Sequence, residues 1–114
     1  MEHSYTVLDD ILLIILQGDL IGENNGPELV KIVNDHLHDQ INRCAVDLSG
    51  VRYMNSSGIG VLITLLTKFR NQEGEMILIK PSEKIEKLLL ITKLNNIFSI
   101  VDSREEALDL LKAL

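Results

Sequence analysis

Residues 51–62, Val-Arg-Tyr-Met-Asn-Ser-Ser-Gly-Ile-Gly-Val-Leu, contain the pattern that decides the fold. A strand-like segment, residues 44–48, leads into this stretch, and an apolar, helix-like segment, residues 59–69, follows it. Ser56 and Ser57 are therefore expected at a helix N-terminus, where unpaired backbone N–H groups and the positive end of the helix dipole favour an anion. A serine there can accept a phosphate without disrupting the fold. The stretch predicts a strand, a loop and a helix, with a candidate switch in the loop.

Length and composition predict one globular domain, residues 1–114, with an aliphatic core. Hydrophobic residues make up 46% of the chain and charged residues 25%, whereas aromatic residues make up only 4%, so Ile, Leu and Val must fill the interior. The formal net charge of −6 argues against direct binding to nucleic acid, because an acidic surface repels the phosphate backbone.

The sequence also predicts a cytoplasmic protein. Its single cysteine, Cys44, excludes an intramolecular disulfide and belongs to no zinc-binding pattern, as suits a reducing compartment. The first residues, Met-Glu-His-Ser-Tyr, lack the basic-then-apolar order of a signal peptide. The longest apolar run, residues 11–16, is far shorter than the roughly 20 residues that span a bilayer. No contact with a membrane is expected.

Strand-like and helix-like patterns alternate along the chain. Asp9-Asp10 indicates a tight hairpin turn, and Ser49-Gly50 indicates the end of a strand. Pro27 suits the first position of a helix that follows a glycine-rich loop. The expected strands are residues 5–8, 11–17, 44–48, 76–79 and 98–101. The expected helices are residues 27–41, residues 57–72, a third that begins at Pro81-Ser82, and residues 103–114.

The last two helices carry further signals. Ser103 and Glu106 have the spacing of a capping box. The third helix is expected to place on its inner face Ile85, Leu88, Leu89 and Ile91. Together the elements predict an α/β fold with a mixed, mostly parallel β-sheet of four to five strands and about four α-helices. In such sheets function usually lies where strands lead into helices, which is the position of the serines.

The helix after the serines is unusually apolar. Residues 59–67 contain no charge, although a surface helix normally keeps a polar stripe. Its outer face would consist of Gly60, Thr64, Thr67 and aliphatic side chains. Either neighbouring helices bury both sides, or the helix offers a docking surface beside the hydroxyls. Exposed apolar residues here would also permit a weak dimer in place of a monomer.

Catalytic and metal sites are not indicated. Ser56 or Ser57 would need a positioned base to act as a nucleophile. His3, His36 and His38 show no sign of converging on them, and the last two are too close in sequence to share a helical face as metal ligands.

Nucleotide motifs are also incomplete. Gly58 and Gly60 form Gly-x-Gly, but neither the third glycine of the dinucleotide fingerprint nor a Walker lysine follows. We therefore expect a protein that is not an enzyme and that uses no metal or cofactor.

A family resemblance covers essentially the whole chain. Residues 46–62, Val-Asp-Leu-Ser-Gly-Val-Arg-Tyr-Met-Asn-Ser-Ser-Gly-Ile-Gly-Val-Leu, resemble the signature of anti-sigma factor antagonists, the bacterial STAS domain. The segments Gly18-Asp19-Leu20, Gly74-Glu-Met-Ile-Leu and residues 88–100 resemble further parts of that family's pattern.

The resemblance implies a partner switch. In that family a GHKL-type serine kinase, which is also the anti-sigma factor, phosphorylates the first serine of the pair and thereby dissolves its complex with the antagonist. A PP2C-type phosphatase restores the unmodified form. By position the acceptor is Ser56, while Ser57 becomes a structural hydroxyl that caps the helix. The implied partner-binding residues are Met54, Asn55, Ser56, Ser57, Gly58, Ile59 and Leu62.

Two features depart from the family pattern. Asn55 stands where the family usually has an acidic residue, so the negative charge beside the acceptor is lost while the capping ability remains. The stretch after Leu20, Ile-Gly-Glu-Asn-Asn-Gly-Pro, is richer in glycine than the usual helix start. Both features suggest a different partner specificity.

Two other functions remain open. A STAS module without a phosphorylation switch could serve another assembly, such as a stress-signalling scaffold or a cytoplasmic subunit of a lipid-transport complex. A small nucleotide-binding or nucleotide-hydrolysing protein is the third alternative, and the lack of a phosphate-binding loop argues against it.

Overall fold

Five strands form one sheet in chain order, β1-β2-β3-β4-β5. The computed structural model describes residues 1–114, and β1 pairs with β2 in antiparallel fashion while every other neighbouring pair is parallel. The predicted mixed, mostly parallel sheet is therefore confirmed. The strands are β1 (Glu2–Leu8), β2 (Ile11–Leu20), β3 (Arg43–Met54), β4 (Glu75–Ile79) and β5 (Ser99–Val101).

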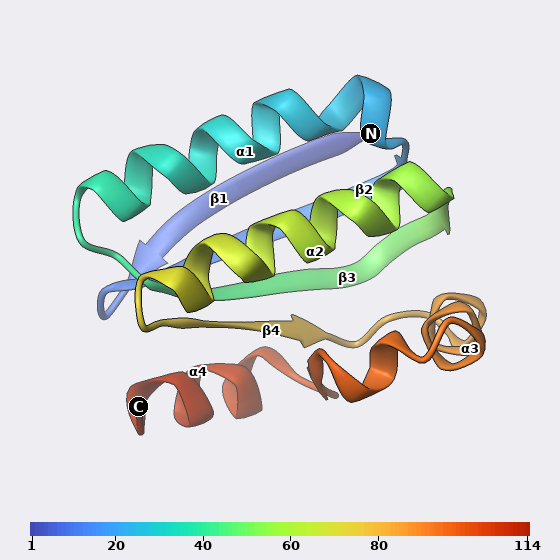
Figure 1. Cartoon of the computed structure of the whole chain (residues 1–114). Coiled ribbons are helices and arrows are strands. Elements are labelled where there is room, and N and C mark those ends of the chain that lie inside the picture. The colour runs from blue at the N-terminus through green and yellow to red at the C-terminus, as the bar shows by residue number, and fades with distance from the viewer.

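Helices cover both faces of this sheet (Figure 1). They are α1 (Gly22–His38), α2 (Ser56–Asn71), α3 (Glu83–Ile91), a short 3-10 helix η1 (Leu94–Asn96) and α4 (Arg104–Lys112). The first three helices and Phe98 share one large aliphatic core with one face of the sheet, whereas α4 packs on the opposite face. Alternate residues of β2 serve the two cores: Leu12 and Ile14 face α1 and α2, and Ile11 and Leu13 face the α4 side. This two-sided burial explains why β2 is almost continuously apolar.

The hairpin predicted at Asp9-Asp10 is confirmed. Leu8 pairs with Ile11 across a two-residue turn, and both aspartates have positive φ angles, 53° and 63°. Two consecutive left-handed residues are what a tight turn between twisted antiparallel strands requires, and aspartate tolerates that conformation.

Two expected strand ends were wrong. The chain continues as β2 beyond Gly18 to Leu20 and as β3 beyond Ser49-Gly50 to Met54. The register of the β2–β3 pairing shifts twice along this part, and Gly18 adopts a φ of 91°. These irregularities bend the strands locally, but the pairing of β2 with β3 continues beyond them. The longer strands carry Met54 to the end of the sheet, where α2 begins.

The start of α1 was also predicted wrongly. The helix begins at Gly22, five residues before Pro27, which lies inside it on the exposed side. A Cβ atom at Gly22 would overlap the backbone of Ser57, and one at Gly26 would lie 2.9 Å from Val61 Cγ2. These glycines therefore permit close packing of α1 on α2, and the pattern that resembles a loop is a packing surface.

The later helices follow the sequence more closely. Ser82 Oγ accepts a hydrogen bond from Ile85 N at 3.3 Å and caps α3, and Ser103 Oγ accepts one from Glu106 N at 3.1 Å and caps α4. Ile91 is an exception to the predicted inner face, because its side chain is 78% exposed. Six residues after Ile85, it has turned away from the face that Ile85 presents to the core.

Asp47 is the one buried charged residue, and it joins β3 to α4. Its Oδ1 accepts from the backbone N–H and hydroxyl of Ser49 at 2.9 and 2.7 Å, and its Oδ2 accepts from Arg104 Nε at 2.9 Å. Burial raises the pKa of Asp47, but the hydrogen bonds from Ser49 and the charge of Arg104 outweigh burial and hold the pKa below its usual value.

We predict that Asp47→Asn lowers the free energy of unfolding by about 1–3 kcal/mol at pH 7, because it removes a charge-assisted hydrogen bond at a buried site. Since the pKa of Asp47 is lower in the folded protein, its contribution is present above the ordinary value of 3.8 and is lost as the pH falls through the folded value. Urea unfolding of wild type, Asp47→Asn and the exposed control Asp109→Asn at pH 7 and at about pH 2 checks this. If Asp47→Asn lowers the free energy of unfolding by the same amount at both pH values, the stabilising role of the Asp47 charge is contradicted.

Candidate functional site

The carboxyl end of β3 and the N-terminal ends of α1 and α2 meet on the right in Figure 1. Asn55 lies between β3 and α2 with an extended backbone, and its Oδ1 accepts a hydrogen bond from Gly58 N at 2.7 Å. Asn55 is therefore the N-cap of α2. The expectation that Ser57 caps this helix was wrong, because Ser56 and Ser57 already lie in its first turn.

The same Asn55 oxygen also contacts the start of α1. Gly22 N, the first backbone N–H of α1, donates to Asn55 Oδ1 at 3.4 Å. Ile21, the N-cap residue of α1, provides no side-chain cap. One carboxamide thus accepts hydrogen bonds from the first turns of two helices, and the bond to α2 is the shorter.

Glycines make this junction sterically possible. A Cβ atom at Gly58 would overlap the carbonyl oxygen of Leu20 at the end of β2, just as one at Gly22 would overlap the backbone of Ser57. A larger residue at Gly22 would push the two helix starts apart, and a larger residue at Gly58 would push α2 away from the end of β2. Gly22 and Gly58 therefore have a packing role that was not predicted from the sequence.

Ser57 is held by a carboxylate from the neighbouring helix. Its Oγ lies 2.8 Å from Glu23 Oε2 and 2.9 Å from Asn55 Oδ1. A hydroxyl has one proton, and we assign it to Glu23, because a hydrogen bond to a carboxylate is the stronger one. Asn55 Nδ2 donates to the same Glu23 oxygen at 3.4 Å.

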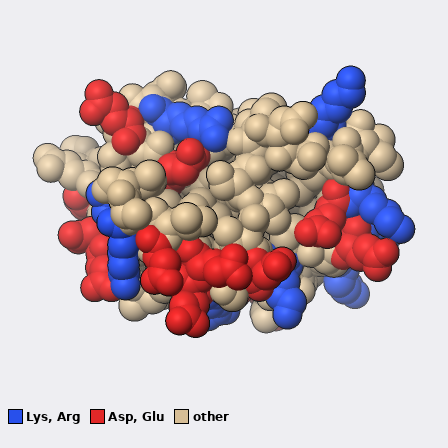
Figure 2. Space-filling model, turned by 90° about the horizontal axis from the view of Figure 1, so that it is seen from below, with Lys and Arg blue, Asp and Glu red and all other residues tan.

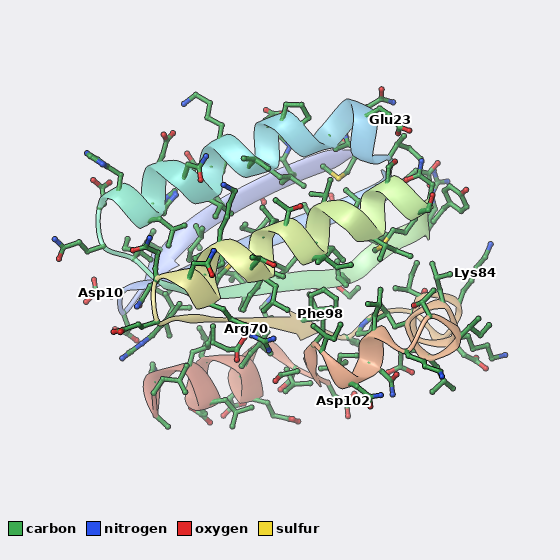
Figure 3. The ribbon with its side chains drawn as sticks, in the orientation of Figure 1. Asp10, Glu23, Arg70, Lys84, Phe98 and Asp102 are labelled. Carbon is green, nitrogen blue, oxygen red and sulfur yellow. The ribbon has the colours of Figure 1, made fainter.

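Glu23 was missed by the sequence analysis. The free backbone N–H of Glu23 at the start of α1 lowers the pKa of its own carboxyl, and hydrogen bonds from Ser57 and Asn55 lower it further. The side chain is therefore ionised at neutral pH. Figure 3 shows Glu23 at the beginning of α1, beside the start of α2. An acidic residue in the first turn of a helix was the available signal, but only the contact with Ser57 gives it a place in the site.

Ser56 differs from Ser57 in every respect that bears on modification. It is the first residue of α2, its side chain is exposed, and its hydroxyl forms no hydrogen bond within the protein. Ser57 is half-buried and its hydroxyl is bonded. Of the two hydroxyls, only that of Ser56 is both free and accessible.

The other residues expected to bind a partner lie beneath the surface. Met54, Gly58, Ile59 and Leu62 are buried, and Leu62 has no exposed area at all. These buried residues pack beneath the loop and support it. The accessible part of the expected surface therefore consists of Asn55, Ser56 and Ser57.

The apolar residues of α2 pack inside the protein. Leu65, Leu66 and Phe69 are buried, whereas Thr64 and Thr67 are exposed and donate to backbone carbonyls one turn earlier at 2.9 Å. Neighbouring elements therefore bury the inner sides of this helix, and none of the protein's exposed large hydrophobic side chains lies on α2. Val61 and Ile63 are half-buried beside the exposed threonines.

The histidines lie away from the serines. His3 contacts Glu28 at 3.2 Å, and the ring of His36 packs edge-on against Tyr5 with centroids 5.2 Å apart. No histidine forms a hydrogen bond with either serine, and no three His, Cys, Asp or Glu side chains are grouped so that they could bind a metal ion. None of the helices has the length and apolar character that crossing a membrane requires.

A groove of about 500 Å³ opens beside Ser56. The end of β3, with Tyr53 and Met54, forms one wall together with Ser56, and α3 forms the other wall. Figure 3 shows Lys84 on α3 at this same end of the molecule. This groove extends the site beyond the loop that the sequence indicated.

Comparison with known proteins places the chain in a family. The model of the STAS domain matches residues 3–107, so the chain belongs to the STAS domain family. The family resemblance noted in the sequence is therefore confirmed.

Relatives named as anti-sigma factor antagonists are similar over much of the chain. A candidate anti-sigma factor antagonist of Thermotoga maritima is 28% identical over 105 residues, which are 92% of this chain and 93% of the relative. The crystal structure of a candidate antagonist from the same organism has a TM-score of 0.86 with 28% identity, over 96% of this chain and 93% of that one. The anti-sigma-B factor antagonist of Listeria monocytogenes is 34% identical over 55 residues, 48% of each protein.

A more distant structure shows the same fold. The anti-sigma factor antagonist SpoIIAA in its unphosphorylated form superposes with a TM-score of 0.78 over 99% of this chain and 100% of its own, at 18% identity. This likeness confirms the arrangement of five strands and four helices described above.

Two glycines of α2 provide a matched test of the junction. We predict that Gly58→Ala lowers the free energy of unfolding by about 1–3 kcal/mol, because the added methyl group meets the Leu20 carbonyl. Gly60→Ala should raise it by roughly 0.5–1 kcal/mol, since nothing lies within 4 Å of that position and alanine favours a helix. Urea denaturation of both variants checks this, and the same sign for both would refute the steric account.

Proposed function

We propose that this protein is an anti-sigma factor antagonist that works through a partner switch controlled by phosphorylation of Ser56. In the unmodified state it binds an anti-sigma factor, a GHKL-type serine kinase, in the cytoplasm and so frees a sigma factor. Phosphorylation dissolves the complex, and a PP2C-type phosphatase restores it. The protein acts by binding and catalyses no reaction itself.

The observation that carries this proposal is the difference between the two serines. Ser56 is exposed with a free hydroxyl, whereas Ser57 is held by Glu23. A kinase requires an accessible hydroxyl that can be drawn into its own active site, and Ser56 meets that requirement without breaking a hydrogen bond of the antagonist. The relatives named as anti-sigma factor antagonists support the same role.

Phosphorylation at Ser56 should leave the fold intact. A phosphate adds about −1.5 to −2 charges at neutral pH. It would lie at the first residue of α2, where the helix dipole favours an anion. Phosphorylation should therefore weaken the complex with the partner, because it adds charge and bulk to the contact surface.

Glu23 supplies the acidic group that the loop lacks. The family's usual acidic residue before the serines is Asn55 here, but the Glu23 carboxylate lies within hydrogen-bond distance of both Asn55 and Ser57. The negative charge thus comes from α1 instead of the loop. The accessible partner surface would consist of Asn55, Ser56 and Ser57 with this carboxylate at its edge.

Asn55 also keeps a second candidate function open. A STAS module of another assembly, without a phosphorylation switch, would have no need for an acidic residue beside the acceptor. Such a module would bind its partner at all times and would carry no phosphate on Ser56.

Mass spectrometry of the protein from its native cells separates the two functions. We predict phosphate on Ser56 in a fraction of the molecules when phosphatase inhibitors are present, loss of all phosphate in Ser56→Ala, and retention in the matched control Ser57→Ala. If the protein is never phosphorylated during growth or stress, the partner switch is rejected, and the second function, a module that binds its partner at all times, remains. Phosphate on Ser57 alone would reject the assignment of Ser56.

The same variants test the partner. Ser56→Ala used as bait should retain a GHKL-type kinase, and Ser56→Asp should bind the purified kinase roughly tenfold more weakly, because a negative charge enters the contact. Equal affinity of Ser56→Asp and wild type would show that charge at this position does not control the complex.

A further inference from the structure

The groove beside Ser56 has an apolar floor and an exposed apolar rim. Met54 and Ile85 are buried at its base, and Leu88 is half-buried. At the rim, Ile91 is 78% exposed and Tyr53 is 43% exposed. The exposed apolar side chains next to the serines therefore belong to α3 and the end of β3, and not to α2. A large exposed apolar side chain beside a groove is typical of a surface that another protein covers.

The charged residues that line the groove are both basic, although the protein is acidic. Lys84 and Lys87 line it, and none of its nine lining residues is acidic. Lys84 Nζ lies 5.9 Å from the centroid of the Tyr53 ring and forms no ion pair, whereas Lys87 contacts Glu83 at 3.5 Å. Elsewhere the chain has an excess of acidic groups, with a net charge of −6. Seen from below, acidic side chains gather along the lower edge of the protein, with several basic ones among them (Figure 2).

The apolar floor and the unpaired lysine together indicate which kind of protein segment can bind in the groove. An apolar side chain would fill the floor, and a carboxylate next to it would pair with Lys84, whose positive charge is unpaired. A basic segment would meet two lysines, and a purely apolar one would leave them unpaired.

We propose that this groove docks a segment of the anti-sigma factor in which an apolar side chain stands beside an acidic one. The inference rests on the proposed function and adds the chemistry of the partner's contact segment. Lys84 binds the carboxylate, and Ile91 and Tyr53 enclose the apolar side chain.

The position of Ser56 in the same groove connects docking with the switch. A phosphate on Ser56 would place a dianion in the wall of the groove. It would compete with the partner's carboxylate for Lys84 and repel that carboxylate. Phosphorylation and docking therefore exclude each other for a local electrostatic reason, without a change of fold.

Calorimetric titration of the purified kinase captured with the Ser56→Ala bait tests this proposal. Lys84→Glu is expected to weaken binding by at least about tenfold, because it turns an attraction into a repulsion. Ile91→Ser, which changes an exposed side chain, should weaken binding by about fivefold through the loss of apolar contact. The control Lys31→Glu makes the same change of charge on α1, away from the groove, and should stay within about twofold of wild type.

A charge exchange sharpens the test. Replacing the partner's acidic contact residue with lysine should weaken its binding to wild type and restore its binding to Lys84→Glu. If Lys84→Glu and Ile91→Ser bind as tightly as Lys31→Glu does, the groove is not the docking site, while the proposed function stands. If wild type binds no such kinase at all, the proposed function fails and this inference fails with it.

Discussion

The side-chain amide of Asn55 is the group on which the rest of the site depends. Asn55 directly follows β3, and its Oδ1 accepts hydrogen bonds from the backbone N–H of Gly58 in α2 at 2.7 Å and from that of Gly22 in α1 at 3.4 Å. Two helices that start side by side bring together unpaired N–H groups and two positive dipole ends, which repel. The Asn55 oxygen and the Glu23 carboxylate counter both problems at one point. The contact between the helix starts, and with it the packing of α1 on α2, is stabilised in this way.

The same arrangement separates the roles of the two serines. Glu23 binds Ser57 on the side that faces α1, so the adjacent hydroxyl of Ser56 is left on the solvent side, in the wall of the groove formed with α3. A modification that adds charge at Ser56 therefore acts between the Glu23 carboxylate of α1 on one side and Lys84 and Lys87 of α3, which line the groove, on the other. Partner recognition in this account depends on both sides and not on the loop alone.

The sequence predicted the features that depend on neighbouring residues. The Asp9-Asp10 hairpin, the Ser103 cap and the start of the third helix at Ser82 were predicted correctly, because a turn or a helix start depends on a few consecutive residues. The helical start at Gly22 was not predicted, because a glycine signals a turn as readily as a close contact, and the contact here is with Ser57, far along the chain. Glu23 was missed for the same reason. The family resemblance implied Ser56 as the acceptor, but the difference in exposure and hydrogen bonding between the two serines is visible only in the structure.

Amide hydrogen exchange measured by nuclear magnetic resonance tests the central claim most directly. If the Asn55 side chain joins both helices, the amides of Gly58 and Gly22 are protected in the wild type, and that of Gly58 more strongly, since its hydrogen bond is shorter. In Asn55→Ala both amides should exchange faster, while amides in the centre of β3 keep their protection. Unchanged protection of both glycines in Asn55→Ala would contradict the account, and a loss confined to Gly58 would reduce Asn55 to the cap of a single helix.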